Sequence, residues 1–598
     1  MKTFDKISIL CMGLMLAACA GNKEQVPDTP QEVKPEPETR TLTFVLPKDG
    51  EKTAWKVGDA IIVHGEYAKD QVTVTLEAGD IMADGKTAIC TVKNLYPYVN
   101  EECTSTLYAA YPAEAVDNLA HCFYYTKFKA TDRQIMAAYN DATNKFQFQN
   151  LCGSMSFSTG EDFTSLALVG NKKETLGLEF LQVLLTDKEQ NYAQYLGAPI
   201  VQMECPASAV TTIYFPAGTT FPAGLYIKFK DASGKFVKCF RTYDSISIER
   251  AKNTDLGDIS SEVVVYDDPF SDDILDLDTN GNANCYILTE PGKFKFKAVR
   301  GNDHTSYLED AAKADVLWET WNDDSEVEVG SIIKSASYAE DYVIIHTADV
   351  LHPGNAVVAL RDLNDKILWS WHFWVPKTPI ETKDYDNLMG APSMDRHLGA
   401  LVATEAGEAT VDQQSYGLFY QWGRKDPFPG MFANNGITVA GVQMERQNGA
   451  ISVAESIANP TLYTYSKRGD EGYEWCTDIT EEFWSEIWGN GGDKTIYDPC
   501  PAGYRVPKGS GTAWTKSNTG WTFDTINGWF ENSGLVFPYC GYMDDNGGSY
   551  GKNLERSVVW CAAASSATDG KAMYIKAAAY NSASARAARG SSVRCVTE

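Results

Sequence analysis

Four side chains in the last third of the chain have the types and the spacing of a sugar-binding surface. Tyr420, Trp422, Arg424 and Asp426 stand at alternate positions, so in a β-strand they would share one face. Aromatic rings stack on the apolar faces of sugars, and charged groups hold sugar hydroxyls through hydrogen bonds. The spacing therefore predicts a ligand-binding groove at these residues. The alternative for Trp422 is an ordinary place in a hydrophobic core.

Catalysis would need a nucleophile, a base and a group that orients the base. The nearest approach to such a set is Asp395, Arg396 and His397, and the whole chain has only seven histidines. The sequence contains no GxSxG, HExxH or Walker motif. We therefore predict that the protein is not an enzyme and that these three residues fix a loop through hydrogen bonds.

One acidic run has the beginning of a calcium-binding loop. Asp276, Asp278 and Asn280 occupy positions one, three and five, and Gly281 occupies position six. Position twelve needs a bidentate Glu, and Ile287 stands there. An Asx-rich turn is the favoured interpretation, as it is for the polar run at 544–548. Because the cysteines show no CxxC spacing either, we predict no metal and no cofactor.

The first 19 residues have the organisation of an export signal. A basic start is followed by an apolar run from 7 to 18 that is too short to span a bilayer as a mature helix. The run ends in Leu-Ala-Ala-Cys, which resembles a bacterial lipobox and implies a diacylglycerol on the thiol of Cys19. The alternative is an ordinary signal peptide with an incidental cysteine. Residues 20–40 are rich in Pro and Glu and predict a solvated tether.

Length and charge limit the classes of function. A chain of 598 residues implies several domains. Its formal net charge of −28 argues against a nucleic-acid partner, because phosphate binding needs clustered Lys and Arg. Short alternating strands separated by turn residues predict a mainly β protein built from sandwiches. Residues 42, 44 and 46 are apolar and alternate with polar or small positions, which predicts a first strand at 41–46.

Residues 41–262 are expected to form two β-sandwiches, at 41–150 and 151–262. Several phrases there resemble the fimbrillin family of two-domain pilins: TAWKVGDAI at 53–61, YAAYP at 108–112, NLCGSMSF at 150–157 and IYFPAG at 213–218. In that family a protease removes a first strand after a basic residue, and a strand of a neighbouring subunit fills the gap. The resemblance implies a possible cut at Arg40, the alternative being that Arg40 has no role. Assembled material should then begin at Thr41.

Residues 267–378 are expected to form a third β-sandwich that connects the pilin-like pair to the C-terminal module. Phe294 and Phe296 alternate with lysines, so we expect them to face a core. The strand around Trp369, Trp371 and Trp374 is apolar on both sides, which predicts burial of both of its faces. Prolines at 376 and 379 predict a linker after it.

The last third, residues 384–598, contains spaced islands of sequence. They are MDRHLGA at 394–400, YGLFYQWGRKDPF at 416–428, YDPCPAGYRVP at 497–507 and SVRCV at 592–596. These islands resemble the FISUMP domain of surface proteins in Gram-negative anaerobes, which implies an α+β fold related to C-type lectins. The Trp-Asn-Asp motif of calcium-dependent lectins is missing, since the nearest segment is VWCA at 559–562. A short helix is predicted at 480–489, and the module is expected to fold on its own. It holds five cysteines, so they cannot all pair within it.

Together these features predict a surface lipoprotein of the outer membrane. The favoured interpretation is a lipid-anchored fimbrial accessory or tip subunit that mediates adhesion. Its expected partners are other fimbrial subunits and a host or bacterial surface ligand, either glycan or protein. The alternative is a surface glycan-binding lipoprotein that does not enter a pilus.

Overall fold

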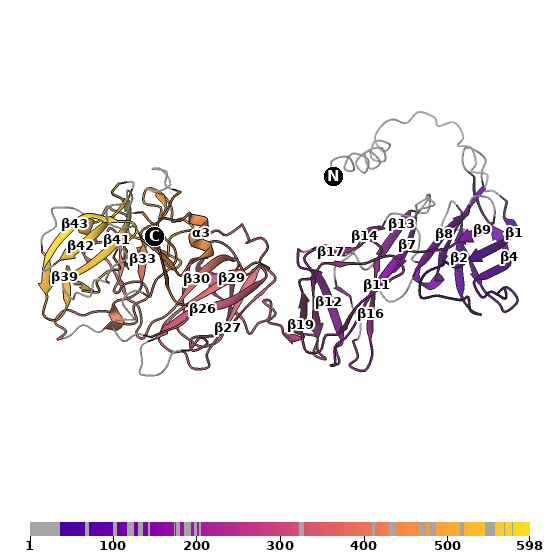
Figure 1. Cartoon of the computed structure of the whole chain (residues 1–598), viewed down its shortest axis with the longest axis horizontal. Helices are drawn as coiled ribbons and strands as arrows, with labels where there is room; N and C mark the ends of the chain where they lie inside the picture. Colours follow the sequence, from indigo (N-terminus) through magenta and orange to yellow (C-terminus); the bar gives the residue numbers. More distant parts are fainter. Residues whose placement is uncertain are drawn as a thin grey trace, which may run out of the picture.

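The structure of the chain is a computed structural model (Figure 1). It describes residues 36–598 except for a set of short segments. These are 66–70, 100–104, 117–124, 130–134, 141–143, 173, 175–179, 185–192, 197–199, 202–204, 322–327, 410–412, 430–437, 466–473, 479–485, 515–519, 545–555, 567 and 577. Cys19 and residues 1–35 as a whole lie outside the described part. Within that part, no helix has both the length and the apolar character that crossing a membrane requires.

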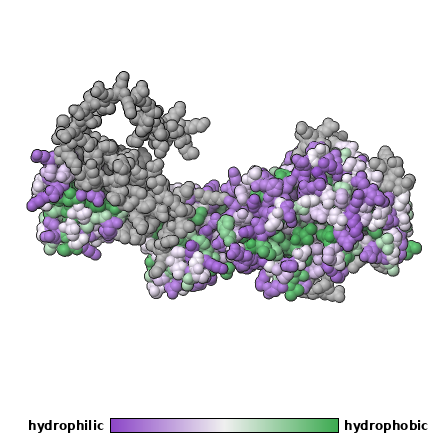
Figure 2. All heavy atoms as spheres, turned by 180° about the vertical axis from the view of Figure 1, so that it is seen from behind, coloured by the Kyte–Doolittle hydropathy of each residue, from purple (hydrophilic) through white to green (hydrophobic). Residues whose placement is uncertain are grey.

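The chain is mainly β, as predicted, and its sheets follow one another along an elongated molecule (Figure 1). Hydrophilic residues predominate on the face shown in Figure 2, in keeping with the net charge of −28. Four successive units can be followed from the N-terminal to the C-terminal end. They are a first sandwich, a second sandwich, a connector and a C-terminal module.

The first sandwich packs a three-stranded sheet, β4-β1-β9, against a larger sheet that contains β10-β8-β6-β2-β3. Leu42, Phe44 and Leu46 point into the core between the sheets, which confirms the alternation expected for the first strand. That strand, β1, runs from Glu38 to Val45 and so starts before the predicted position. The other strands of this unit are β2 (Ala60–His64), β3 (Val72–Thr75), β4 (Thr87–Leu95), β5 (Tyr98–Val99), β6 (Ser105–Tyr111), β8 (Met136–Asn140), β9 (Lys145–Gln147) and β10 (Gln149–Asn150).

The second sandwich has its own core, built from apolar residues between Met155 and Ile259. Its sheets are β16-β11-β21 and β15-β12-β18-β19-β22. A further sheet joins it to the first unit, because β13 pairs with β7 (Tyr125–Lys129). The strands are β11 (Cys152–Ser158), β12 (Ser165–Gly170), β13 (Phe180–Leu184), β14 (Ala193–Leu196), β15 (Ile200–Val201), β16 (Thr211–Pro216), β17 (Thr220–Phe221), β18 (Leu225–Lys230), β19 (Phe236–Thr242), β20 (Ile246–Ser247), β21 (Asn253–Asp258) and β22 (Val264–Val265).

The connector consists of two sheets, β23-β25-β28-β27 and β24-β30-β29-β26-β34. Phe294 and Phe296 are buried in its core, as predicted. Both faces of β30 are buried, also as predicted: Trp369 and Trp371 face the connector's core, whereas Trp374 belongs to a different core. The strands are β23 (Leu275–Asp276), β24 (Cys285–Ile287), β25 (Lys293–Lys297), β26 (Lys313–Trp321), β27 (Ile333–Ala339), β28 (Tyr342–Thr347), β29 (Gly354–Arg361) and β30 (Ile367–Val375), with the 3-10 helix η3 (Leu277–Asn280).

The C-terminal module is built on the five-stranded sheet β33-β44-β41-β42-β43 and three smaller sheets. A disulfide joins Cys500 to Cys595, and Cys476, Cys540 and Cys561 are buried thiols. The strands are β31 (Thr382–Lys383), β32 (Ser393–Met394), β33 (Phe419–Gln421), β34 (Thr438–Gly441), β35 (Glu445–Asn448), β36 (Leu462–Tyr465), β37 (Tyr504–Arg505), β38 (Thr522–Asp524), β39 (Trp529–Asn532), β40 (Leu535–Pro538), β41 (Arg556–Ala564), β42 (Asp569–Lys576), β43 (Ala579–Arg586), β44 (Gly590–Val593) and β45 (Val596–Thr597).

Helical structure in this module is sparse among the described residues. The helix α3 (Val453–Ala458) begins with a capping box, in which Ser452 and Glu455 bond each other's backbone N–H groups. Most of the helix expected at 480–489 lies outside the described residues. The α+β, lectin-like character of the module therefore stays a prediction.

The expectation that residues 384–598 fold on their own stays a prediction, and two features of the structure argue against it. Strand β34 of the module pairs with β26 of the connector and completes the connector's sheet. One hydrophobic core runs across the expected boundary, since Trp318 and Trp374 of the connector pack in the same cluster as Trp422 and Trp560 of the module. The prolines at 376 and 379 thus connect two parts of one folded unit.

Candidate functional site

The first candidate site is the groove that holds β1. This strand lies in the middle of its sheet, antiparallel to β4 on one side and parallel to β9 on the other. Its inward side chains Leu42 and Phe44 have exposed fractions of 0%, and Leu46, directly after the strand, has an exposed fraction of 3%. Phe44 stacks on Phe146 with 5.4 Å between ring centroids. If β1 left, both neighbouring strands and the apolar floor beneath it would be exposed.

Arg40 lies inside β1 rather than in front of it, which corrects the position expected from the sequence. Its backbone pairs with Val92 of β4. Its guanidinium forms an ion pair with Glu38 at 2.6 Å and donates a hydrogen bond to Asn144. A cut after Arg40 would therefore leave residues 41–45 attached to the chain. Release of the strand would require those residues to unpair as well.

The four residues of the predicted sugar-binding groove lie in the interior, so the groove is not formed in this structure. The exposed fractions of Tyr420 and Trp422 are 0%, and those of Arg424 and Asp426 are 1% and 3%. The indole N–H of Trp422 donates to the carbonyl oxygen of Cys561 at 2.9 Å. The alternative interpretation, a core position for Trp422, is the one that the structure shows. The strand expected there is also shorter than the alternation suggests, since β33 ends at Gln421 and only Tyr420 of the four lies in it.

The charged members of this group hold the connector and the module together. Lys425 Nζ lies 2.5 Å from Asp426 Oδ1, and both groups bond Ser370 of β30. The ammonium of Lys425 also lies 4.5 Å from the ring centre of Trp369. Burial lowers the pKa of Lys425, and the nearby carboxylate of Asp426 opposes that shift. The pair is a buried structural ion pair at the junction of two units.

Arg424 also forms its hydrogen bonds inside the protein. It donates hydrogen bonds to the carbonyl oxygens of Leu462 and Asn459 and to the side chain of Gln421. Burial lowers the pKa of its guanidinium to about 10. These contacts fix the loops around α3. The guanidinium of Arg424 is therefore not accessible to a ligand at the surface.

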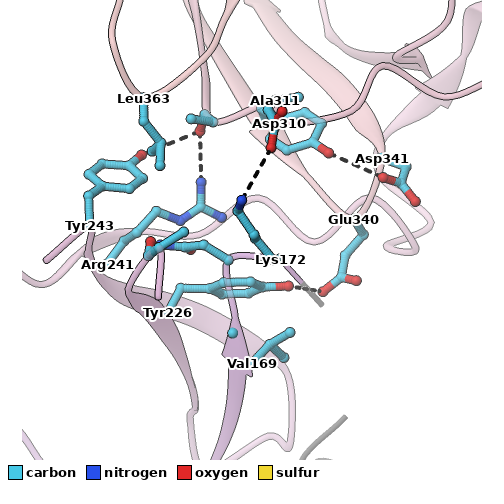
Figure 3. Close-up of a pocket in the computed structure, with 15 residues that line it drawn as sticks. Val169, Lys172, Tyr226, Arg241, Tyr243, Asp310, Ala311, Glu340, Asp341 and Leu363 are labelled. Carbon is cyan, nitrogen blue, oxygen red and sulfur yellow. Dashed lines mark hydrogen bonds and ion pairs between the residues drawn. The ribbon is translucent and has the colours of Figure 1, made fainter. Parts of the chain in front are cut away.

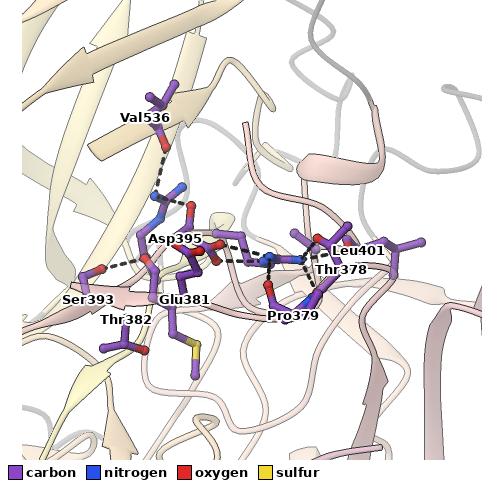
Figure 4. A network of polar contacts seen from close by, with 12 residues as sticks. Thr378, Pro379, Glu381, Thr382, Ser393, Asp395, Leu401 and Val536 are labelled. Atoms are coloured by element: carbon purple, nitrogen blue, oxygen red, sulfur yellow. Dashed lines mark hydrogen bonds and ion pairs between the residues drawn. The ribbon is translucent and has the colours of Figure 1, made fainter. Parts of the chain in front are cut away.

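The loop of residues 395–397 is held by a network of hydrogen bonds, as the sequence predicts (Figure 4). Arg396 forms an ion pair with Asp395 and donates to the carbonyl oxygens of Thr378, Pro379 and Leu401. The guanidinium thereby fastens the segment that links the connector to the module. His397 is fully buried, and burial lowers its pKa well below the usual value. A buried neutral imidazole that no substrate can reach is a poor candidate for a catalytic base.

The acidic run at 276–281 forms the turn that the sequence favours. Asp276 accepts a hydrogen bond from the backbone N–H of Asp278 at 2.9 Å. Asp278 accepts one from the hydroxyl of Tyr286 and one from the backbone N–H of Lys297, each at 2.7 Å. Among the residues that the structure describes, no cluster of three or more His, Cys, Asp or Glu is arranged to hold a metal. The run at 545–548 lies outside the described residues.

A second candidate site, at the joint between the second sandwich and the connector, was not predicted. Glu340 sits in the turn between β27 and β28 and reaches β18 of the second sandwich. Its carboxylate accepts a hydrogen bond from the hydroxyl of Tyr226 at 3.0 Å and pairs with Lys228 at 2.6 Å. Burial, and then the negative charge of Glu340, raise the pKa of Tyr226.

Tyr226 and Lys228 lie on the face of β18 opposite the core, and this outer face meets the next unit. The available signal was the tyrosine at 226, which shares a face with the lysines at 228 and 230. A cavity lies beside these contacts (Figure 3).

Comparisons with known proteins leave the family undecided. No protein-family model and no curated protein matches the sequence. A fimbrial assembly protein from Parabacteroides distasonis matches 39% of this chain and 100% of its own, with 6% identity and a TM-score of 0.23. A candidate adhesin from Bacteroides ovatus matches 37% of this chain and 87% of its own, with 7% identity and a TM-score of 0.22.

A third solved structure is described as a candidate polysaccharide-binding protein (DUF1812) from Bacteroides thetaiotaomicron. It covers 39% of this chain and 99% of its own length, with 10% identity and a TM-score of 0.22. TM-scores this far below 0.5 decide neither the fold nor the function. The resemblances to fimbrillins and to FISUMP domains therefore stay predictions.

Proposed function

We propose that the protein is a lipid-anchored, cell-surface fimbrial accessory or tip subunit that mediates adhesion and joins its neighbours by exchange of β1. The observation that carries the proposal is the position of β1: a central strand close to the N-terminal end, with an arginine in its first half. In this proposal a cut after Arg40 frees the strand from the tether. The strand then leaves its groove, and a strand from a neighbouring subunit takes its place.

The energetics of the groove support such an exchange. Burying a Leu or Phe side chain contributes about 1.5–3 kcal/mol, so Leu42 and Phe44 of β1 and the adjoining Leu46 contribute roughly 5–9 kcal/mol together. An empty groove would lose that stabilisation and would leave backbone N–H and C=O groups of β4 and β9 without partners. A replacement strand restores both contributions. Exchange is therefore close to neutral overall, whereas an empty groove is strongly disfavoured.

A disulfide lock on β1 tests this proposal directly. Thr41 of β1 lies opposite Thr91 of β4, and their side-chain oxygens are 3.3 Å apart on the exposed face. Replacing both with cysteine should form a cross-strand disulfide without changing the core. Since the lock lies after Arg40, the cut remains possible while the strand is held in place.

The oxidised Thr41→Cys/Thr91→Cys protein, treated with an arginine-specific protease, should remain monomeric in size-exclusion chromatography. The same sample should assemble after reduction, and the Thr41→Cys single variant should assemble under both conditions. Assembly of the oxidised double variant at the normal rate would rule out exchange of β1.

The lipid anchor is the second element of the proposal, and it depends on Cys19. Two or more acyl chains give stable membrane attachment, at about 0.8 kcal/mol per buried CH₂. Labelled palmitate should enter the wild-type protein, and Cys19→Ser should release it from the outer membrane. Membrane retention and labelling of Cys19→Ser would contradict the anchor.

The second candidate function is a surface glycan-binding lipoprotein that does not enter a pilus. The cavity at the joint between the second sandwich and the connector favours it, because it offers a binding site that needs no assembly. Immunogold microscopy separates the two candidates. Label along or at the end of filaments supports the fimbrial subunit, and label confined to the membrane supports the lipoprotein. Either role is one of binding, because the residues that resemble a catalytic set hold the structure together.

A further inference from the structure

The cavity beside Glu340 has a volume of about 200 Å³ and is lined by residues of both adjoining units (Figure 3). The second sandwich contributes Lys172, Tyr226, Arg241 and Tyr243, and the connector contributes residues around 310–312, 338–341 and 363. Pockets for drug-sized molecules usually measure about 300–1,000 Å³. The size of this one suits a single sugar ring rather than a long ligand.

The cavity presents hydrogen-bond donors from the second sandwich. The guanidinium of Arg241 lies 4.6 Å from the ring centre of Tyr226 and donates one hydrogen bond, to the carbonyl oxygen of Ala312 at 2.8 Å. A guanidinium has five N–H donors, so this bond uses one of them. Stacking on the ring fixes the orientation of the group. Lys172 of the same unit also lines the cavity (Figure 3).

The acceptors come from the connector. Asp310 lies 3.9 Å from Lys172, and Asp341 accepts a hydrogen bond from the hydroxyl of Tyr338 at 3.1 Å. Glu340 completes the set of three carboxylates. Asp310 and Glu340 retain acceptor capacity, because an ionised carboxylate has about four lone-pair sites.

The balance of charge selects the ligand. The two cations line one side of the cavity and the three carboxylates line the other, so a ligand with a net charge would meet groups of its own sign as well as of the opposite sign. The hydroxyls of a neutral sugar both donate and accept, and they suit this mixture. Tyr243 and Leu363, with exposed fractions of 42% and 41%, offer apolar surface to the C–H face of a sugar ring.

We propose that this cavity binds one neutral sugar residue of a surface glycan. The proposal supplies the ligand class for the adhesive role proposed above and rests on that role. It moves the binding site from the C-terminal module to the joint between the second sandwich and the connector. It does not depend on exchange of β1. Because both units line the cavity, the joint must be closed for binding.

The test uses the full chain and an array of neutral and acidic glycans, followed by saturation-transfer NMR with the methyl glycoside of the terminal sugar of the strongest neutral ligand. Tyr243→Ala and Asp310→Asn should each weaken glycan binding at least tenfold. The matched control is Tyr307→Ala, which removes a tyrosine of the connector with a similar exposed fraction, 40%, that does not line the cavity. It should bind as the wild type does.

A thermal melt of each variant establishes that the fold is intact. Glu340→Gln, which weakens the contact between the two units, should also reduce binding. Binding of acidic glycans alone would overturn the neutral-sugar assignment. The absence of glycan binding, or unchanged binding in Tyr243→Ala and Asp310→Asn, would show that the cavity is only a gap between packed units. Assembly of the disulfide-locked protein, by contrast, bears only on the exchange of β1.

Discussion

The two halves of the molecule bury their apolar side chains in different ways. In the N-terminal half each sandwich has a core of its own, one extending from Leu42 to Phe148 and the other from Met155 to Ile259. In the C-terminal half one core includes residues of both the connector and the module, and buried charges lie along the junction. The proposed exchange of β1 would therefore disturb the core of the first sandwich alone. The C-terminal half is expected to fold and unfold as one unit.

The largest effect is expected when the connector is separated from the module. We expect a fragment of residues 384–598 to lack a cooperative thermal transition, because it loses β26, the partner of β34, together with the connector's share of the core. A fragment of residues 267–598 should melt in one transition. Melting is monitored by circular dichroism in the near ultraviolet. A cooperative transition of the short fragment would show that the module folds on its own.

The next effect concerns the buried ion pair at that junction. Asp426→Ala leaves the ammonium of Lys425 buried without its carboxylate, which should cost about 3–5 kcal/mol in the free energy of unfolding. Asp365→Asn is the control, because it removes an exposed ion pair with Lys313 and should leave the denaturation midpoint unchanged. Chemical denaturation of the 267–598 fragment measures both. A negligible effect of Asp426→Ala would mean that the junction does not depend on this pair.

A core substitution in β1 should lower the stability of the first sandwich alone. Leu42→Ala removes a fully buried side chain and should destabilise that unit by about 3 kcal/mol. The transition of the C-terminal half should keep its midpoint in the same calorimetric scan. If both transitions shifted together, the two halves would be coupled and the comparison would fail.

The smallest effect is a dependence on pH in the C-terminal half. Burial lowers the pKa of His372 to about 3, whereas an unfolded histidine titrates near 6.5. Between these two values the unfolded state binds more protons, so the stability that comes from the neutral imidazole is present above pH 6.5 and is lost as the pH falls below it. From pH 7.5 to pH 5 this histidine should account for a loss of about 2 kcal/mol. In denaturation series at the two pH values, His372→Gln should reduce the loss by that amount. An equal loss in the variant would assign the pH dependence to other groups.

The positions of strands, and which of their faces are buried, were predictable where the apolar residues follow the period of a strand. The alternation at residues 42, 44 and 46 predicted β1, and the doubly apolar run around Trp371 predicted a strand buried on both faces. Both predictions depend only on the period of the side chains, which the sequence displays.

The candidate sites were harder to predict, because they depend on which surfaces meet. Trp422 and Arg424 are residue types that often occur at binding sites, yet both are covered by distant parts of the chain. Trp422 bonds Cys561, and Arg424 bonds Asn459. Tyr226 lies on the face of β18 away from the core, and that face meets the connector. Periodicity tells which residues share a face, but it does not tell what covers the face.

The most direct test of the central claim is the N-terminal residue of the protein in assembled material. Filaments or oligomers purified from the cell surface should contain chains that begin at Thr41, as measured by mass spectrometry of the N-terminal peptide. Membrane-bound, unassembled protein should begin at a lipidated Cys19. Assembled chains that all retain the lipidated N-terminus would contradict exchange of β1, and they would identify a subunit that keeps its own first strand.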